Sequence, residues 1–465
     1  MALNKKLNRR RFLKTAGLAA GTAALAACAA PPAAQPGAAP AAPAVPDAAK
    51  PTEAPAKAPA QNSAERPLTP TFYQWIIDLH PQLTEMNKNA EGVKAEIAPV
   101  EGFGIERFVA EAKNKESTWD VYVGMTPFVE MTQLIKSGVI QPWDDFIPKD
   151  VLNDIIPSIR EECSIEGKLY SWPFLLDITG MGWNSAITDK AGINAMPKTW
   201  DDVLAYEKTV VDSKAAPYGG VYDVNGWRSL APMTHSLSTK VYTNDGRFDF
   251  NNEAVVEALK LMKKLKDLGP ANLMEPGSSD GGVNGTPDEL AFAAQKAAYF
   301  FKYFNAPYRM AATWKTPEAL KIGPYPKFAN GEGSTVFWTT GACLFTHGKN
   351  KDKAAEYLKK ITYEPKIWQD SIVGTAAAHP VQLPPYTSIY KDWGAKKPDW
   401  LPEAINTIYG QLPIAKAITN HLFGLKQFQI ARPFYEKYLK GEETDEKKVL
   451  QQCMDAVTEE LKKAA

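Results

Sequence analysis

The chain is poor in the residues on which most metal and nucleophilic sites depend. Its 465 residues contain only 4 cysteines and 5 histidines. The histidines are scattered, with no paired metal-binding pattern and no nucleophile motif beside them. Cys163, Cys343 and Cys453 stand at long, irregular spacing, which indicates neither a disulfide framework nor a metal site. We therefore expect buried thiols, at most one disulfide, no metal, no cofactor and no catalytic residue.

An excess of charge of either sign is also missing. The 53 Lys and Arg residues balance the 53 Asp and Glu residues, so the formal net charge at pH 7 is +0. A global basic field, which binding to nucleic acid or to an anionic membrane surface would favour, is therefore absent. No acidic excess points to a cationic substrate either. We predict that the protein has no nucleic-acid partner.

The apolar stretch near the N-terminus, residues 16–27, is too short to span a bilayer, which takes ~20 apolar residues. The motif RRRFLK at residues 9–14 precedes it and fits the twin-arginine export pattern. The motif LAAC at residues 25–28 follows it and matches the bacterial lipobox, in which the cysteine is lipidated. We predict a signal peptide over residues 1–28 and lipidation of Cys28. The alternative is a Sec-type signal with an incidental cysteine.

Residues 29–66 contain no aromatic residue and almost no branched apolar residue, but they are rich in Ala and Pro. Such a segment cannot bury enough surface to fold, and its prolines favour extended polyproline II. At about 3.1 Å per residue it reaches on the order of 100 Å when extended. Signal, lipid and tether together predict a folded body that is held just outside the cell membrane, at the cell surface or in the periplasm.

Strand-like and helix-like segments alternate at the start of the folded body. We expect strands near residues 69–75, 93–100 and 119–124, and helices near 81–89, 104–115 and 128–136. This alternation predicts an α/β fold with a parallel sheet that is covered on both faces. In such sheets ligands gather at the carboxyl ends of the strands, which places Trp75 and Thr126 on the ligand-facing rim.

The stretch GKLYSWPFLLDITGMGWN, residues 167–184, has two interpretations. It reads as two strand-like pieces, interrupted by the carboxylate of Asp177 and by glycines at 180 and 182. Taken alone, it is typical of a kinked buried strand. In its context it is also what a chain needs to cross from one lobe to another, because glycine absorbs backbone rotation.

Spaced motifs resemble a known family. They are DVYV at 120–123 with GVIQPWDD at 138–145, GKLYSWP at 167–173, WNS at 183–185, AGI at 191–193 and PKTWDD at 197–202. In this order they resemble the extracellular solute-binding proteins of ABC importers, the maltose-binding-like family. Trp143 stands where that family usually has Leu, and Gln295 where it usually has Gly. The resemblance covers about residues 68–463.

The resemblance implies a two-lobed α/β fold of the periplasmic-binding-protein type II class, with several hinge crossings between the lobes. It places residues 67–177 and 342–388 in an N-terminal lobe and residues 178–341 and 389–465 in a C-terminal lobe. Residues 167–184 then form the first crossing, with Asp177 on the cleft floor. Residues 335–346 form the second.

The same resemblance, together with rim positions, nominates the ligand-binding residues. The 12 Trp residues make stacking on sugar rings attractive, while Asp, Asn, Gln and Arg side chains bind hydroxyls. Lys302 and Phe304 are further possibilities after the strand near residue 300. The predicted ligand-binding residues are Trp75, Thr126, Asp177, Trp227, Arg228, Tyr303, Trp338 and Thr340.

The predicted function is capture of a small solute, with carbohydrate favoured, and its delivery to the membrane subunits of an ABC importer by a monomeric, lipid-anchored protein. Polyamine, phosphodiester and ion ligands are compatible with the same fold. One alternative is a secreted carbohydrate-active hydrolase that uses Asp177 as one of two carboxylates. Another is a cell-surface scaffold that binds no small ligand.

Overall fold

The computed structural model describes residues 66–100, 104–268, 272–275, 286–365, 368, 382–395 and 405–464. These residues all belong to one compact unit, Ala64–Ala465. The predicted signal peptide, the lipidation site at Cys28 and the tether up to residue 65 lie outside the described residues. No helix of the described residues is long and apolar enough to cross a membrane.

A mixed β-sheet forms the framework, in the order β2-β1-β3-β12-β7-β10-β8-β9. The outer strands on each side are parallel, whereas β12 and β7 in the middle run antiparallel to their neighbours. The strands are β1 (Pro70–Phe72), β2 (Glu96–Ile97), β3 (Val121–Met125), β4 (Ile140–Gln141), β5 (Ser164–Ile165), β6 (Lys168–Leu169), β7 (Trp172–Asn184), β8 (Tyr218–Asp223), β9 (Asn272–Glu275), β10 (Ala297–Tyr303), β11 (Leu320–Gly323), β12 (Val336–Phe345) and β13 (Lys416–Ala417).

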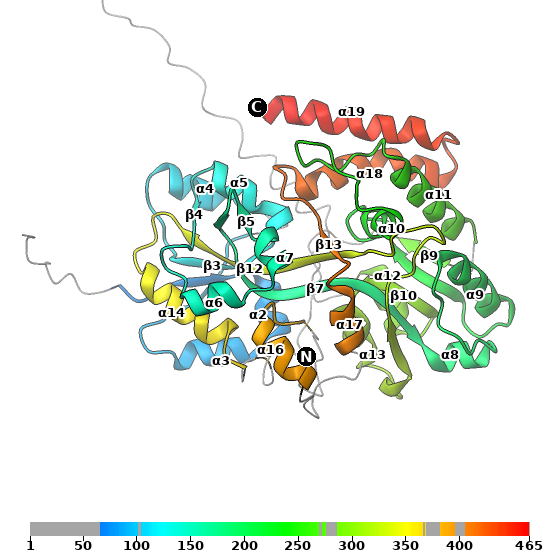
Figure 1. The fold of residues 1–465 in the computed structure, drawn as a ribbon, viewed down its shortest axis with the longest axis horizontal. Coiled ribbons are helices and arrows are strands. Elements are labelled where there is room, and N and C mark those ends of the chain that lie inside the picture. The colour runs from blue at the N-terminus through cyan, green and yellow to red at the C-terminus, as the bar shows by residue number, and fades with distance from the viewer. Residues whose placement is uncertain are drawn as a thin grey trace, which may run out of the picture. The chain divides into compact units, whose positions relative to one another are not determined.

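Strand β7 is one continuous strand of 13 residues, where the sequence predicts two pieces. Its residues up to Ile178 pair with β12, and its residues from Thr179 pair with β10. The glycine at 180 serves close packing and does not break the strand, because a Cβ atom there would lie 1.8 Å from the Phe304 ring. We call the strands on the β12 side the first half of the sheet and those on the β10 side the second half. Figure 1 shows β7 passing from one half to the other.

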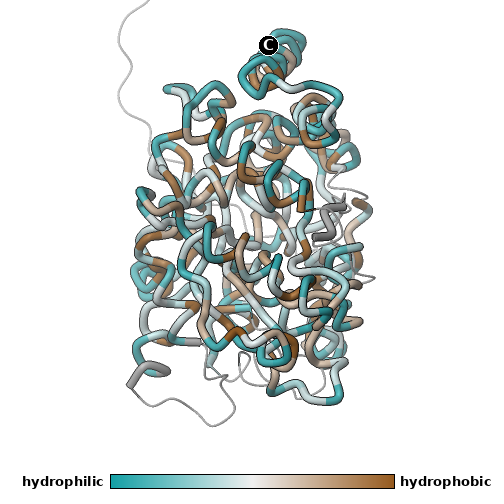
Figure 2. Tube along the Cα trace, turned by 90° about the vertical axis from the view of Figure 1, so that its right-hand side faces the viewer, coloured by the Kyte–Doolittle hydropathy of each residue, from teal (hydrophilic) through white to brown (hydrophobic). Residues whose placement is uncertain are grey.

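Helices flank both halves of the sheet (Figure 1). Teal and brown residues alternate along them in Figure 2, as expected for helices with one face on a core. The helices are α2 (Gln74–Leu79), α3 (Gln82–Asn89), α4 (Glu106–Lys113), the π-helix η2 (Pro127–Met131), α5 (Thr132–Lys136), α6 (Lys149–Asp154), α7 (Pro157–Glu162), α8 (Ser185–Lys190), α9 (Trp200–Asp212), α10 (Leu230–Leu237), α11 (Glu253–Asp267), α12 (Pro287–Ala293), α13 (Asn305–Ala311), the 3₁₀-helix η4 (Pro317–Ala319), α14 (Lys351–Thr362), α16 (Thr387–Ala395), α17 (Ile405–Gln411), α18 (Gly424–Lys440) and α19 (Glu446–Ala464).

Local sequence signals explain several helix starts. Thr199 caps α9 by accepting a hydrogen bond from the Asp202 amide, and the Asp202 side chain accepts one from the Thr199 amide in return. The secondary structure predicted from the sequence is wrong at two places near the rim. Trp75 lies in the short helix α2 and not in a strand, and the segment after Thr126 begins as the π-helix η2 before it continues as α5.

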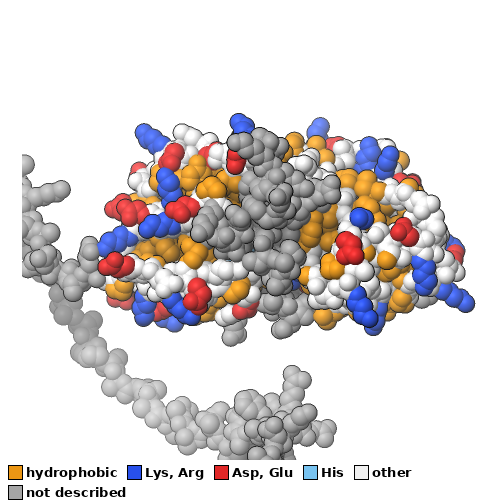
Figure 3. All heavy atoms as spheres, turned by 90° about the horizontal axis from the view of Figure 1, so that it is seen from below, with side chains coloured by type: hydrophobic (Ala, Val, Ile, Leu, Met, Phe, Trp, Pro, Cys, Tyr) orange, Lys and Arg blue, Asp and Glu red, His pale blue; other side chains and the backbone are white. Residues whose placement is uncertain are grey.

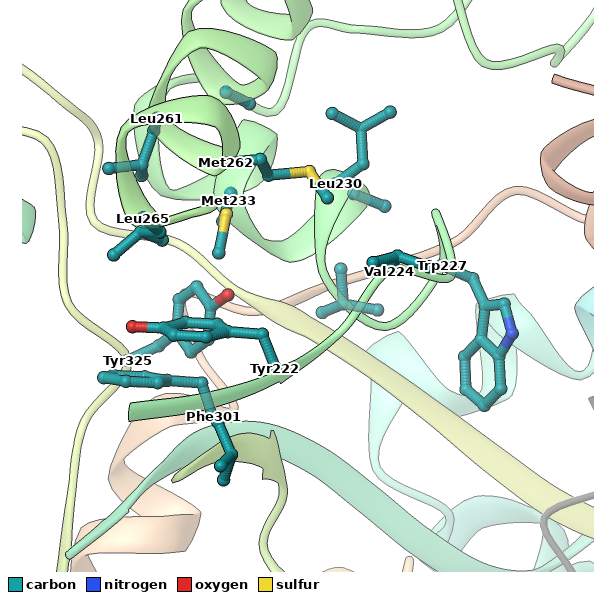
Figure 4. Close-up of a cluster of buried hydrophobic side chains, with 14 of the residues drawn as sticks. Tyr222, Val224, Trp227, Leu230, Met233, Leu261, Met262, Leu265, Phe301 and Tyr325 are labelled. Carbon is teal, nitrogen blue, oxygen red and sulfur yellow. The ribbon is translucent and has the colours of Figure 1, made fainter. Parts of the chain in front are cut away.

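Two clusters of buried apolar residues form the core, one beside each half of the sheet. The first cluster contains mainly residues 68–178 and 342–415, and Ile389, Ile408 and Leu412 belong to it. The second contains mainly residues 181–338 and 418–457. In Figure 4, Tyr222 and Phe301 of the second cluster lie stacked, with ring centroids 5.2 Å apart. In the same view Trp227 lies apart from this stack, to its right.

Candidate functional site

A cavity of about 640 Å³, including its mouth, lies where the two halves of the sheet meet. Its walls come from α2, η2, β7, β12, α13 and α18, and from the segment that follows β8. The lining residues are Trp75, Leu79, Thr126, Phe128, Val129, Asp177, Trp227, Arg228, Tyr303, Asn305, Arg309, Trp338, Thr340, Gln382 and Leu425.

All of the residues predicted to bind a ligand line this one cavity. Trp338 and Thr340 face it together because alternate residues of β12 point to the same side of the sheet. Thr126, which follows β3, reaches Thr340, with their hydroxyl oxygens 3.3 Å apart. The structure thus brings together side chains that are more than 200 residues apart in sequence.

Four aromatic rings pack on one another at one end of the cavity. The Trp338 ring centroid lies 5.3 Å from that of Trp227, 5.5 Å from Tyr303 and 6.4 Å from Phe128. Phe128 comes from η2, next to the first half of the sheet, yet it belongs to the second apolar cluster. Its ring therefore bridges the two halves. Trp75 is half-buried and lies apart from this group in α2.

Arg228 is held as a charged group at the cavity wall. Its Nη1 atom donates to Asp223 Oδ2 at 2.7 Å, and its guanidinium lies 4.4 Å from the centroid of the Trp227 ring. Burial opposes the charged form, but the negative charge of Asp223 outweighs it and raises the pKa of Arg228. One face of Trp227 is therefore occupied by a cation.

Asp177 lies at the boundary between the halves and is 6 % exposed. Its Oδ1 atom accepts a hydrogen bond from Asn305 Nδ2 at 2.5 Å, and its Oδ2 atom accepts one from Gln382 Nε2 at 3.1 Å. Burial raises the pKa of Asp177 to about 6, although these amides and the charge of Arg309 act in the opposite direction. Because a carboxylate oxygen has more than one lone pair, Asp177 can still accept from a ligand hydroxyl.

Lys302 lies behind the wall and does not line the cavity. Its Nζ atom lies 3.0 Å from Glu289 Oε1 and 3.1 Å from Asp288 Oδ2, in a buried ionic cluster that also includes Asp223 at 4.0 Å. Tyr303 donates to Glu289 Oε1 at 3.2 Å, so this cluster orients a ring that does line the cavity. The alternative site residue Phe304 likewise points away, against residue 180 of β7.

Sequence reasoning missed four polar or aromatic lining residues: Phe128, Asn305, Arg309 and Gln382. Phe128 carried a signal, because it stands two residues after the rim residue Thr126. Asn305 follows the nominated segment 302–304 directly. Arg309 and Gln382 carried no local signal, since their position depends on how α13 and the chain before α16 pack.

The described residues contain no group of His, Cys, Asp or Glu side chains that could hold a metal ion. Cys163, Cys343 and Cys453 are free and buried. Burial raises the pKa of each thiol above its ordinary value, which keeps the reactive thiolate rare. Among the described residues that line the cavity, Asp177 carries the only carboxylate.

Solved structures share this fold at low sequence identity. The GacH receptor of Streptomyces glaucescens GLA.O, studied unliganded and with acarbose, matches with a TM-score of 0.69 and 18% identity, over 86% of this chain and 99% of that one. The maltose-bound MalE3 of T. maritima matches with a TM-score of 0.67 and 14% identity, over 86% and 99%. The fold is thus the two-lobed periplasmic-binding-protein type that the sequence predicts. We infer that the lobes are built around the two halves of the sheet, since each half has its own apolar cluster.

Curated sequences match over shorter stretches. A binding protein of Brucella abortus is 22% identical over 241 residues, which are 49% of this chain and 55% of that protein. The match therefore spans about half the length of this curated relative. The maltotriose-binding protein of Pyrococcus abyssi is 26% identical over 92 residues, 20% of this chain and 19% of that protein.

The family comparison covers most of the folded body. Residues 78–362 match the family described as bacterial extracellular solute-binding protein. This range begins in α2 and ends with α14, so it includes both crossing strands, β7 and β12, and most of the cavity wall. The chain belongs to the bacterial extracellular solute-binding protein family.

Proposed function

We propose that this protein is the lipid-anchored solute-binding component of an ABC importer and that it captures a small sugar or oligosaccharide between its two lobes. One observation supports this most strongly. A single cavity combines the rings of Trp75, Trp227 and Trp338 with hydrogen-bonding groups such as Asp177 and Asn305. Sugars have apolar C–H faces and a rim of hydroxyls, and they need both kinds of partner.

The other ligand classes fit the wall less well. A polyamine needs several carboxylates, whereas Asp177 is the only one among the described lining residues. A phosphodiester needs uncompensated positive charge, whereas Arg228 and Arg309 lie next to Asp223 and Glu289. Similar folds have been solved with acarbose, maltose and D-mannitol, which are neutral or nearly neutral polyols. Hydrolysis is also disfavoured, because the usual glycosidase mechanism needs a second carboxylate across the bond.

A ligand screen by thermal unfolding tests the proposal. Glucose, maltose, maltotriose, D-mannitol, spermidine and glycerol 3-phosphate would each be added at increasing concentration. We expect at least one neutral sugar or polyol to raise the melting temperature, since a ligand at 100 times its Kd adds about 2.7 kcal/mol of stability. Sugar remaining intact after prolonged incubation would exclude turnover. A response to spermidine or glycerol 3-phosphate alone would contradict the carbohydrate assignment.

The membrane anchor and the permease partner rest on the sequence and on family membership. RRRFLK at 9–14 and LAAC at 25–28 support export and lipidation. We expect the full chain to partition with membranes and to carry lipid at Cys28, and a Cys28→Ala variant to be released. Metabolic labelling with a fatty acid, followed by membrane fractionation, measures both. A membrane-bound but unlabelled wild type would argue for an uncleaved signal.

On the face drawn in Figure 3, acidic and basic side chains of the described residues are interspersed, and apolar side chains lie between them. This mixture is typical of a soluble domain surface and agrees with the balanced composition of the chain. We propose in addition that the protein is a monomer and that it binds its permease partner transiently.

A further inference from the structure

Each oxygen of the Asp177 carboxylate accepts a hydrogen bond from a side-chain amide. Asn305 donates to one of its oxygens and Gln382 to the other, and all three side chains are buried. Hydrogen bonds to an ionised carboxylate are among the stronger polar contacts in proteins. A bridge of this kind fixes the direction in which the carboxylate faces the cavity.

Each amide is itself held in one orientation. The Gln382 carbonyl oxygen lies 2.8 Å from His80 Nε2, and the Asn305 carbonyl oxygen accepts from Arg309 Nε at 3.2 Å. With their oxygens engaged in this way, both amides must turn their NH₂ groups toward Asp177. A chain of polar contacts therefore runs from His80 through Asp177 to Arg309.

The two amides come from opposite lobes. Gln382 stands next to Leu383, which bridges to Leu176 in the part of β7 that belongs to the first half. Asn305 begins α13 directly after β10 in the second half. Asp177 lies between them, just before β7 changes its partner from β12 to β10. If the two halves rotate about this junction, Asp177 keeps both amide contacts only when both elements follow it, so rotation strains at least one of them.

We propose that Asn305 and Gln382 are positioning residues that clasp the two lobes together through Asp177 and present its carboxylate to the ligand. The inference rests on the proposed function only in that the cavity is taken to receive a solute. The clasp lowers the cost of closure before the ligand arrives, so more of the binding free energy appears as affinity. The ligand hydroxyl then meets an acceptor whose direction is already set.

The lobe separation of the ligand-free protein tests the clasp. Exposed Lys113 in α4 and Lys264 in α11 lie on different lobes and can be replaced by cysteine for spin labelling, in a Cys28→Ser full-length background. The native cysteines at 163, 343 and 453 are buried and should not react. We expect Asn305→Leu and Gln382→Met, which resemble the native side chains in shape but lack the amide, each to shift the closed-to-open ratio by about tenfold toward open.

A double-mutant cycle separates the clasp from a general packing effect. In an Asp177→Ala background, the substitutions at 305 and 382 should have no further effect on the distance distribution. Tyr357→Phe is the matched control, because it removes a buried hydroxyl that lies outside the cavity and donates to Asn87 within the first half. It should leave the distances unchanged. Melting temperatures establish that each variant is folded, and Asn305→Ser replaces Asn305→Leu if the latter does not fold.

Distances that are unchanged in both amide variants would overturn the clasp, and so would full additivity with Asp177→Ala. A wild type that is already open without ligand would overturn it as well. These measurements involve no ligand. Failure of the carbohydrate assignment in the thermal screen therefore leaves their outcome intact, and the reverse also holds.

Discussion

The tryptophans of the cavity are not equivalent. Trp227 is only 9 % exposed, carries Arg228 over one face and contacts Phe128 and Trp338. Trp75 is half-buried in α2, and its ring lies beside that of Tyr73, with centroids 6.5 Å apart. At the scale of single residues, Trp75 therefore has more ring surface to offer a ligand, whereas Trp227 contributes more to the wall.

Replacing these two residues should separate binding from stability. We expect Trp75→Ala to lower ligand affinity by about tenfold with a small loss of stability, because a stacking surface is lost. Trp227→Ala should lower affinity and also cost about 3 kcal/mol of unfolding free energy, as is usual for a buried aromatic residue. Titration calorimetry and urea unfolding measure the two effects. Equal stability losses in both variants would contradict the distinction.

The sequence could locate much of the site, because rim positions and family motifs both point to the ends of β3 and to the two crossing strands. It could not identify Arg309 or Gln382. Gln382 is held by His80, 302 positions earlier in the chain. Arg309 contacts Asn305 within α13, but it reaches the cavity only through the way α13 packs. Such partners depend on tertiary packing, and a single sequence does not encode packing in any local pattern.

At the scale of elements, the joint between η2 and α18 holds one end of the cavity. Gly424 begins α18 against the backbone of Phe128, and a Cβ atom there would lie 1.8 Å from the Phe128 carbonyl oxygen. Thr132 adds a hydrogen bond of 3.0 Å to the carbonyl of Asn420. Local propensity predicted a plain helix in place of η2. The joint that shapes it involves residues nearly 300 positions apart.

Two glycine substitutions test this joint. We expect Gly424→Ala to cost about 1–3 kcal/mol of unfolding free energy, because the added methyl group overlaps the Phe128 backbone. Gly410→Ala, in α17, is the matched control, since a Cβ atom there meets nothing within 4 Å. It should be neutral or stabilising by up to about 1 kcal/mol. Urea unfolding of both variants measures the contrast. An unfolding free energy of Gly424→Ala equal to that of the wild type would contradict a rigid contact between η2 and α18.

At the scale of the whole molecule, buried carboxyls make stability depend on pH. Glu130 and Glu162 are 3 % and 4 % exposed, and burial raises the pKa of each from 4.5 to about 8. The unfolded chain releases these protons at lower pH than the folded protein does. Their contribution to stability is therefore complete below about pH 4.5 and is lost as the pH rises through about 8.

Glu162→Gln should flatten this dependence. Glu162 accepts from the Thr339 hydroxyl at 2.7 Å on the side of β12 away from the cavity, and a glutamine keeps an acceptor there without a charge. We expect the variant to gain stability relative to wild type between pH 5 and pH 8. Exposed Glu161→Gln is the control and should follow the wild-type profile. Urea unfolding at both pH values measures this, and parallel profiles for Glu162→Gln would contradict the assignment.

The general architecture could be predicted from the alternation of strands and helices together with the family motifs. The continuity of β7 could not, because its glycines at 180 and 182 read locally as interruptions. In the folded protein they admit Phe304 and Pro307 side chains against the strand. Glycine at a strand position means a break in one context and close packing in another, and only the neighbours decide between them.

An unbroken β7 limits how this molecule can move. The strand is hydrogen-bonded to β12 on one stretch and to β10 and β11 on the next, so pulling the lobes straight apart would strip both ladders at once. Ile178 marks the junction, because it pairs with Phe337 of β12 while its carbonyl accepts from the Phe304 amide at 3.0 Å. We therefore expect any relative motion of the two halves to be a torsion centred on this junction, with no separation of the strands.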